Sequence, residues 1–271
     1  MAEQVLNAVV AHRAEVAPGL IIMRVVPDGW ELPAFRPGQF AVLGLPAEAP
    51  RWPGANGDEA PPKPGMLIRR SYSIASSSVE KGYLEFYFNL VNSGTLTPRL
   101  FALREGDRVW LGPKITGLFT FDQVPGSCNI VMIATGTGLA PYMSMLRTDV
   151  ERDSGRRLAV LHGARHAQDL GYRPELALME EHHPCFTYLA TVSRPAEEPS
   201  PWTGLVGHVQ DLWQGRVLDG IWGFRPEPDN THAFLCGNPA MIQDVTRILT
   251  GEGFREHSRQ RPGEIHAEKY W

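Results

Sequence analysis

Cysteine is scarce in this chain. Its three cysteines, Cys128, Cys185 and Cys236, stand far apart, without a CxxC pair and without the even number of a disulfide framework. This spacing predicts neither disulfide bridges nor a zinc site. An iron–sulfur cluster is excluded as well, because it takes about four such ligands. We expect no metal site, so any redox chemistry must use an organic cofactor.

Long hydrophobic runs are also absent. The longest apolar stretches, such as residues 129–135, are far shorter than the ~20 residues that a membrane helix needs. Residues 1–10 carry Glu3 and have neither a basic start nor a long apolar run, so they do not look like a signal peptide. We expect a soluble protein without integral membrane association, and the cytoplasm as its compartment.

Positive charge is not in excess either. The formal net charge is −4 over 271 residues, which argues against nucleic acid as a partner. A hydrophobic content of 43% and a charged content of 21% are typical of a globular protein. The length suffices for one large domain or two ordinary ones.

The sequence pattern of the first half of the chain predicts an antiparallel β-barrel or sandwich. Short apolar runs alternate with Gly and Pro, which is the pattern of strands and tight turns, at residues 20–26, 39–45, 84–91 and 108–111. Residues 46–65 are rich in Pro, Gly and Ala and keep no apolar periodicity. They are predicted to form a long, mobile surface loop.

The texture changes after about residue 124. Apolar strands are each followed by a helix-like segment, which predicts an α/β domain with a parallel sheet and helices on both faces. The predicted strands are residues 129–135, 158–164, 186–192 and 233–236. We therefore divide the chain into residues 1–124 and 125–271.

A glycine turn follows the first of these strands. The sequence Gly136-Thr137-Gly138-Leu139-Ala140-Pro141 leads into an apolar helical stretch at 142–146. A strand, glycine turn and helix start aim backbone N–H groups at a phosphate. Pro141 replaces the third glycine of the dinucleotide fingerprint and suits the first turn of a helix. Taken alone, a tight turn in an ordinary sheet protein is an equal alternative.

Two arginines stand where the next strands end. An NAD site usually places an acidic residue after the second strand, whereas this chain has Arg165 there and Ser193-Arg194 after the third strand. Cations at neighbouring strand ends suit a 2′-phosphate and hence NADP. The alternative is that both are solvated loop residues.

After the fourth strand, Cys236-Gly237-Asn238-Pro239 forms a turn at the same edge of the predicted sheet. The thiol of Cys236 could also simply fill the core.

Three further segments are candidates for a flavin site. Arg70-Ser71-Tyr72-Ser73, directly before a predicted strand, offers a cation for a pyrophosphate, an aromatic face and a hydroxyl. Gly94-Thr95-Leu96-Thr97 precedes a predicted helix at 98–103 and suits either a second phosphate or a threonine cap. The end of the chain, Glu268-Lys269-Tyr270-Trp271, suits core anchors or a lid over a flavin.

Together and in this order, these motifs resemble the plant-type ferredoxin–NADP+ reductase superfamily, and the C-terminus is most similar to its bacterial ferredoxin/flavodoxin–NADP+ reductase branch. The resemblance implies an FAD-binding antiparallel β-barrel over residues 1–124. It implies an NADP-binding α/β domain over residues 125–271.

The resemblance also assigns residues to FAD. Arg70 would contact its pyrophosphate, Tyr72 would stack on the isoalloxazine, and Ser73 would hydrogen-bond near the flavin N5. Tyr270 would cover the second face of the flavin, and Trp271 would lie against the adenine of a folded FAD. The whole set is Arg70, Ser71, Tyr72, Ser73, Gly94, Thr95, Leu96, Thr97, Thr137, Tyr270 and Trp271.

For NADP, the resemblance puts the 136–138 turn under the pyrophosphate, Arg165 and Arg194 at the 2′-phosphate, and Cys236 beside the nicotinamide. The set is Gly136, Gly138, Pro141, Arg165, Arg194, Gly237, Asn238 and Pro239. Bacterial relatives commonly carry another arginine after Thr203-Gly204, where this chain has Leu205, so the preference for NADP is expected to be moderate. The 46–65 loop is longer than the family leads us to expect.

The implied activity is that of an enzyme, a ferredoxin/flavodoxin–NADP+ reductase. It would exchange a hydride with NADP(H) and single electrons with ferredoxin or flavodoxin, with Ser73, Cys236, Glu268 and Tyr270 as catalytic residues. One alternative is an NAD(P)H-dependent flavin reductase component of an oxygenase system. Another is a non-catalytic subunit that senses flavin or nucleotide, although the presence of Ser73, Cys236 and Glu268 together favours catalysis.

Overall fold

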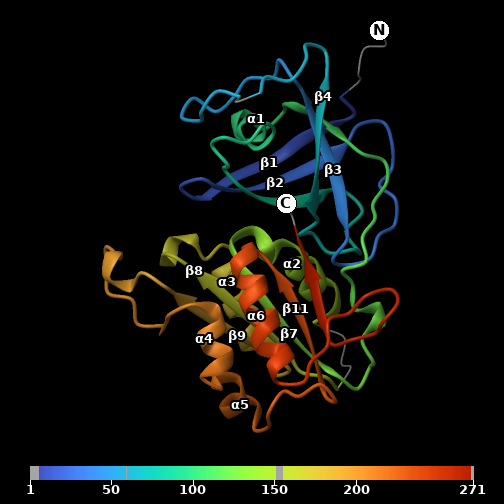
Figure 1. Cartoon of the computed structure of the whole chain (residues 1–271). Coiled ribbons are helices and arrows are strands. Elements are labelled where there is room, and N and C mark those ends of the chain that lie inside the picture. Colours follow the sequence, from blue (N-terminus) through green and yellow to red (C-terminus); the bar gives the residue numbers. More distant parts are fainter. Residues whose placement is uncertain (1–5, 59, 151–154, 270–271) are drawn as a thin grey trace. The chain divides into compact units, whose positions relative to one another are not determined.

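The computed structural model describes residues 6–58, 60–150 and 155–269 (Figure 1). The chain forms two compact units. Unit 1 comprises Met1–Thr120 and Ala140–Thr148, and unit 2 comprises Phe121–Leu139 and Asp149–Trp271. Helix α2 (Ala140–Asp149), which the sequence places in the second domain, thus packs with the first unit almost to its end.

Unit 1 is built on a six-stranded antiparallel sheet in the order β4-β3-β6-β1-β2-β5. Just after β4, the backbone N–H of Ala75 donates to the carbonyl of Glu85 in β5 at 2.8 Å, which brings the two edge strands together and closes the sheet into a barrel. Its elements are β1 (Ala8–Ala17), β2 (Leu20–Pro27), β3 (Phe40–Pro46), β4 (Leu67–Ser73), β5 (Leu84–Asn89), α1 (Thr97–Ala102) and β6 (Arg108–Leu111).

The predicted strands of the first half are confirmed as β2, β3, β5 and β6, and two predictions were incomplete. Strand β1 was missed because polar residues such as His12, Arg13 and Glu15 interrupt its apolar pattern. Arg70 to Ser73 lie within β4 and not before a strand, because they pair with β3 from Leu43↔Arg70 to Phe40↔Ser73. The barrel interior is filled by buried side chains such as Ile21, Met23, Leu43, Phe86 and Phe88.

Unit 2 contains a six-stranded parallel sheet in the order β10-β9-β8-β7-β11-β12. Helices α4, α5 and α6 cover one face of the sheet, where their side chains pack on β7, β8 and β11, and α3 packs along β9 (Figure 1). The elements are β7 (Asn129–Thr135), β8 (Leu158–Ala164), α3 (Arg173–His182), β9 (Phe186–Val192), β10 (Leu205–Val206), α4 (Val209–Gln214), α5 (Val217–Trp222), β11 (Thr231–Cys236), α6 (Pro239–Gly251) and β12 (Ile265–Glu268).

Strands β7, β8 and β9 are confirmed at their predicted bounds, because strands buried on both faces give continuous apolar runs, whereas β11 begins two residues before the predicted 233–236. The sequence missed β10 and β12, which lie at the two edges and have two and four residues.

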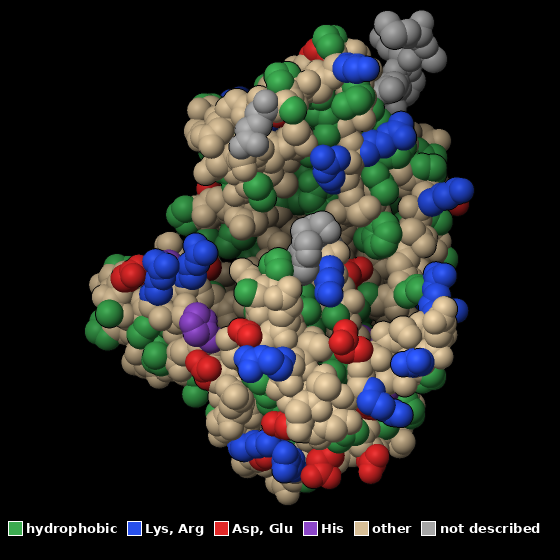
Figure 2. Space-filling model, viewed as in Figure 1, with side chains coloured by type: hydrophobic (Ala, Val, Ile, Leu, Met, Phe, Trp, Pro, Cys, Tyr) green, Lys and Arg blue, Asp and Glu red, His purple; other side chains and the backbone are tan. Residues whose placement is uncertain are grey.

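The surface carries charges of both signs. Figure 2 shows acidic and basic side chains interspersed over the face viewed. None of the helices in the described part of the chain combines the length and the apolar character needed to cross a bilayer. Within the described ranges, no group of three or more His, Cys, Asp and Glu side chains is arranged to hold a metal ion. Cys128, Cys185 and Cys236 form no disulfide with one another.

Candidate functional site

The carboxyl edge of the parallel sheet gathers the predicted nucleotide residues of unit 2. Strands β9, β8, β7 and β11 are neighbours in this order and run in the same direction. Their ends at Val192, Ala164, Thr135 and Cys236 therefore lie at one edge. Open α/β sheets bind ligands at this edge.

Two turns at this edge approach each other at the backbone. In the turn after β7, a Cβ on Gly138 would meet the carbonyl oxygen of Cys236 and lie 2.6 Å from the backbone nitrogen of Gly237. In the turn after β11, Gly237 has a φ of +132°, and a Cβ there would lie 2.6 Å from the carbonyl oxygen of Thr135. Both positions therefore need glycine for steric reasons.

The glycine turn itself is a short 3₁₀ segment, η2 (Gly136–Leu139), that runs into α2. Gly136 adopts a φ of +55°, in the left-handed region that favours glycine. Pro141 is the second residue of α2, where its missing N–H leaves no helical hydrogen bond unmade. The strand, turn and helix start predicted from the sequence are thus present, with Thr137 half-buried in the turn.

The turn after β11 is fixed by two hydrogen bonds of Asn238. Its backbone N–H donates to Thr135 Oγ1 at 2.8 Å, which joins the turn to the end of β7. Its side-chain Oδ1 accepts the N–H of Ala240 at 2.8 Å and caps α6, with Pro239 at the first helical position. The Asn238 side chain therefore serves the helix, a structural role that the sequence reading did not assign.

Cys236 and Glu268 lie side by side at the same edge. They are directly paired in register across β11 and β12. The thiol of Cys236 is fully buried, and Glu268 is half-buried. Tyr270 and Trp271, which follow Glu268 closely, lie outside the described residues.

Arg165 and Arg194 are brought together by their backbones. The N–H of Arg194 donates to the carbonyl of Arg165 at 3.1 Å, and both side chains are exposed. Arg194 Nη1 also lies 3.4 Å from Glu197 Oε2, an acidic neighbour that the sequence reading missed. Leu205, which begins β10, supplies no third cation.

Unit 1 places the predicted flavin residues on β4. Arg70 is exposed, and its Nη2 donates to Thr95 Oγ1 at 3.3 Å across 25 positions of sequence. The Tyr72 ring packs edge-on against Phe88, with centroids 4.8 Å apart and planes at 86°. Burial raises the pKa of the Tyr72 phenol, so the hydroxyl stays protonated. Ser73 is buried, and Ser71 is exposed.

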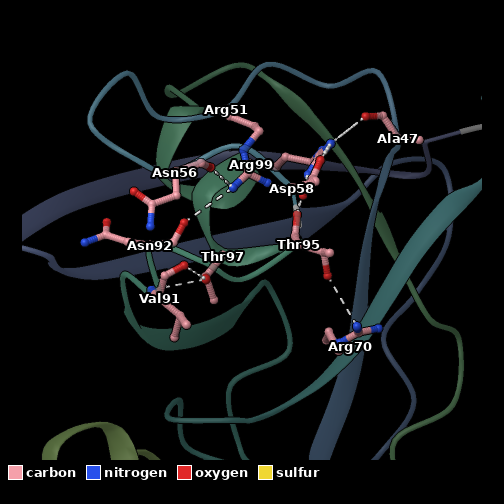
Figure 3. Close-up of polar contacts among 10 residues, drawn as sticks. All are labelled: Ala47, Arg51, Asn56, Asp58, Arg70, Val91, Asn92, Thr95, Thr97 and Arg99. Carbon is pink, nitrogen blue, oxygen red and sulfur yellow. Dashed lines mark hydrogen bonds and ion pairs between the residues drawn. The ribbon is translucent and has the colours of Figure 1, made fainter. Parts of the chain in front are cut away.

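The turn at residues 94–97 lies next to Arg70 (Figure 3). Thr97 Oγ1 accepts the backbone N–H of Val91 at 3.3 Å and donates to its carbonyl at 3.4 Å, so this hydroxyl closes the turn. Thr97 does not cap α1, because the capping position is Leu96, which makes no side-chain cap. Leu96 is buried in the barrel core, so only its backbone is available to a ligand. Gly94 donates its N–H to the Val91 carbonyl at 2.8 Å.

A buried ion cluster, which the sequence did not reveal, fastens the 46–65 loop to this turn (Figure 3). The guanidinium of Arg99 is only 4% exposed and donates to both carboxylate oxygens of Asp58, at 3.2 and 2.8 Å. Arg99 also donates to the carbonyls of Ala47 and Thr95. Arg51 forms a second ion pair with Asp58. The hydrogen bond from Arg99 lowers the pKa of Asp58, which keeps it ionised.

Comparisons with known proteins agree with this geometry. A family model described as the oxidoreductase NAD-binding domain matches residues 132–247. The flavodoxin/ferredoxin–NADP reductase of Escherichia coli (strain K12) is 34% identical over 239 residues, 88% of each chain. The ferredoxin–NADP reductase of Azotobacter vinelandii is 31% identical over 250 residues, which cover 87% of this chain and 86% of the relative.

A solved structure supports the fold. The crystal structure of a ferredoxin NADP+ reductase from Neisseria gonorrhoeae with bound FAD and NADP superimposes with a TM-score of 0.81, covers 98% of both chains and is 22% identical. The identity of 34% over most of the chain shows the family. This chain belongs to the flavodoxin/ferredoxin–NADP reductase family.

Proposed function

We propose that this protein is an FAD-dependent enzyme that exchanges a hydride with NADP(H) and single electrons with a ferredoxin or flavodoxin. The relatives named above carry these activities in their names. The observation that carries the proposal is the carboxyl edge of unit 2. There, two glycine turns in backbone contact lie beside two strand ends that each deliver an arginine.

The two turns suit the pyrophosphate of NADP(H). Gly136 and Gly138 add no side chain to the turn, and the turn leads into the start of α2, where the free N–H groups of a helix favour an anion. The close approach of Gly138 to Gly237 keeps other side chains out of this position. A phosphate can therefore approach the main chain directly.

Arg165 and Arg194 suit the 2′-phosphate that distinguishes NADP from NAD. A charge-assisted hydrogen bond of this kind contributes roughly 1.5–3 kcal/mol. Glu197 competes for the guanidinium of Arg194 at 3.4 Å, and Leu205 adds no cation. We therefore expect a preference for NADPH over NADH that is real but moderate.

The residues on β4 suit FAD. Arg70 is exposed; its guanidinium donates to the Arg69 carbonyl at 2.8 Å and to Thr95 Oγ1 at 3.3 Å, and it forms no ion pair among the described residues, so it can take a phosphate as its counter-charge. Phe88 packs against the Tyr72 ring in a T-shaped arrangement, which holds the tyrosine in place for contact with a flat ligand. Bound FAD supplies the chemistry, because a flavin takes up a hydride and passes electrons on. Ser73 offers a hydroxyl one residue further along the strand.

Cys236 and Glu268 suit the nicotinamide end of the coenzyme. They are neighbours in register at the strand ends, beyond the turn assigned to the pyrophosphate. The thiol is small and fully buried, and the carboxylate beside it can accept a proton or a hydrogen bond. Tyr270 follows in the sequence and is proposed as the cover of the flavin. Ferredoxin or flavodoxin as partner, and the cytoplasm as compartment, complete the proposal.

The test is anaerobic reduction of the purified yellow protein. NADPH should bleach the bound FAD, and added oxidised ferredoxin or flavodoxin should restore its absorption. With Arg165→Ala and Arg194→Ala combined, kcat/KM for NADPH should fall at least about 100-fold while that for NADH changes little, since two contacts worth roughly 1.5–3 kcal/mol each are removed.

Arg247→Ala is the matched control, because Arg247 is 77% exposed on α6 and pairs only with Asp244 among the ion pairs described. A flavin that stays oxidised under NADPH would contradict the proposal and favour a subunit that only senses nucleotides. An unchanged NADPH to NADH ratio in the double variant would remove the two arginines from the site.

A further inference from the structure

A groove of about 250 Å³ lies between the 46–65 loop and strand β4 in unit 1. Its lining includes Ala60, Pro62, Met66, Ile68, Arg70 and Thr95. Whole ligands of drug size occupy roughly 300–1,000 Å³, so this groove has room for one part of a dinucleotide and not for all of it. We call it the loop groove.

The loop groove has an apolar wall and a cationic end. Pro62, Met66 and Ile68 provide the wall, and Met66 is 44% exposed, so its side chain can contact a ligand. Arg70, which the proposed function assigns to a phosphate of FAD, and its neighbour Thr95 form the other end. A flat, weakly polar base joined to a phosphate matches this combination.

Strand β4 connects the loop groove to the proposed flavin position. Alternate residues of a strand share a face, so Ile68, Arg70 and Tyr72 lie on one face of β4. At about 3.3 Å per residue, Ile68 and Tyr72 are separated by roughly 13 Å. Ile68 is buried in the barrel core, so the apolar surface at this end comes from Pro62 and Met66. A ligand laid from this wall along β4 meets apolar side chains, the cation of Arg70 and the ring of Tyr72 in turn, which is the order of base, phosphate and flavin.

The ion cluster of Asp58, Arg99 and Arg51 holds the loop that forms the outer wall of the groove in a fixed position. Asp58, two positions before Ala60, is held by Arg99 and Arg51, and the fully hydrogen-bonded Arg99 is nearly inaccessible to water. Arg99 also donates to the carbonyl of Thr95, which lines the groove. The loop and the phosphate end of the groove are therefore fixed by the same side chain.

We infer that the loop groove binds the adenosine monophosphate half of FAD, so that FAD lies extended along β4 and the adenine is not folded back onto Trp271. This inference rests on the proposed function. It also gives the long loop a purpose, namely to supply the apolar wall for the adenine.

The test compares FAD with FMN, which lacks the adenosine half, by fluorescence titration of the full-length protein after its flavin has been removed. Pro62→Glu places a carboxylate in the groove, and Pro61→Glu, at an exposed neighbour outside the lining, is the matched control. Pro62→Glu should weaken FAD at least about tenfold, or 1.4 kcal/mol, and leave FMN nearly unchanged. Pro61→Glu should change neither.

A second arm needs no substitution in the loop. Millimolar 5′-AMP should compete with FAD for the wild-type protein and leave FMN binding almost unchanged. Equal losses for both flavins with Pro62→Glu, or no loss for either, would overturn the inference. So would removal of Trp271 that reduces FAD affinity to the level of FMN. Failure of the wild-type protein to bind either flavin would instead overturn the proposed function.

Discussion

The fully buried His162 should add to the sensitivity of unit 2 to mild acid. His162 lies on β8 and is fully buried, with Nδ1 3.1 Å from the Tyr188 hydroxyl and no hydrogen-bond partner at Nε2 among the described residues. Burial lowers the pKa of His162 from 6.5 to about 4, because the charged ring would lose its hydration. The folded protein therefore keeps this ring neutral at pH 5.

The direction of the effect follows from the two protonation states. Below pH 6.5 the unfolded chain binds a proton at His162 that the folded chain does not bind until near pH 4. The free energy of unfolding is therefore unaffected by His162 above pH 6.5, and it decreases as the pH falls from there toward 4. Between pH 7 and pH 5 the loss amounts to about 2 kcal/mol, and the whole shift corresponds to about 3 kcal/mol.

The assay is thermal unfolding at pH 7 and pH 5 of the wild type, His162→Leu and the control His182→Gln. His182 is an exposed histidine at the end of α3. The drop in Tm between the two pH values should be roughly 4–8 °C smaller in His162→Leu than in the wild type. The control should follow the wild type. His266, whose pKa burial lowers to about 3, contributes equally to all three proteins. Equal drops in all three proteins would refute the reasoning.

Two further predictions concern the candidate site. Gly138→Ala places a Cβ 2.6 Å from the backbone nitrogen of Gly237. The affinity for NADP+ should therefore fall at least about tenfold, while FAD stays bound. Titration followed by difference absorption measures this affinity, and an unchanged value would contradict the steric argument. Asp58→Asn leaves the buried guanidinium of Arg99 without its counter-charge and should destabilise the protein by about 3 kcal/mol. Asp244→Asn, at an exposed pair, should cost less than about 1 kcal/mol; equal losses in chemical denaturation would show that the cluster contributes no more than a surface pair.

Much of the architecture could be predicted because its signals are local. Strands β7, β8 and β9 are buried on both faces, so their apolar runs mark their bounds. The glycine turn after β7 is equally local. Strand β1 escaped prediction because its charged residues face outward or pair across the barrel. Its place in the sheet depends on pairing with β2 and β6, which no local pattern encodes.

In the candidate site, too, the residues with a local sequence signal could be predicted, and those that depend on long-range contacts could not. Arg165 and Arg194 could be found because both follow predicted strands, and the parallel sheet brings such ends together. Glu197 was missed, although it stands three residues after Arg194, because the strand-end argument stops at the arginine. The Asp58 and Arg99 pair joins positions 41 residues apart, one of them in a loop without periodicity. The burial of Arg99 depends on its ion pair with Asp58, and only the folded chain brings the two residues together.

The packing of helix α2 with unit 1 has a consequence for chimeras made between this protein and its relatives. The helix follows the glycine turn in sequence, yet Arg147 binds Glu85 at 2.6 Å and the Ala75 carbonyl at 2.9 Å, and Thr148 Oγ1 lies 3.0 Å from Ser77 Oγ, all within unit 1. A chimera cut once between the halves would separate this helix from its packing partners. A functional exchange of nucleotide units must instead use three junctions and keep residues 140–148 with the barrel.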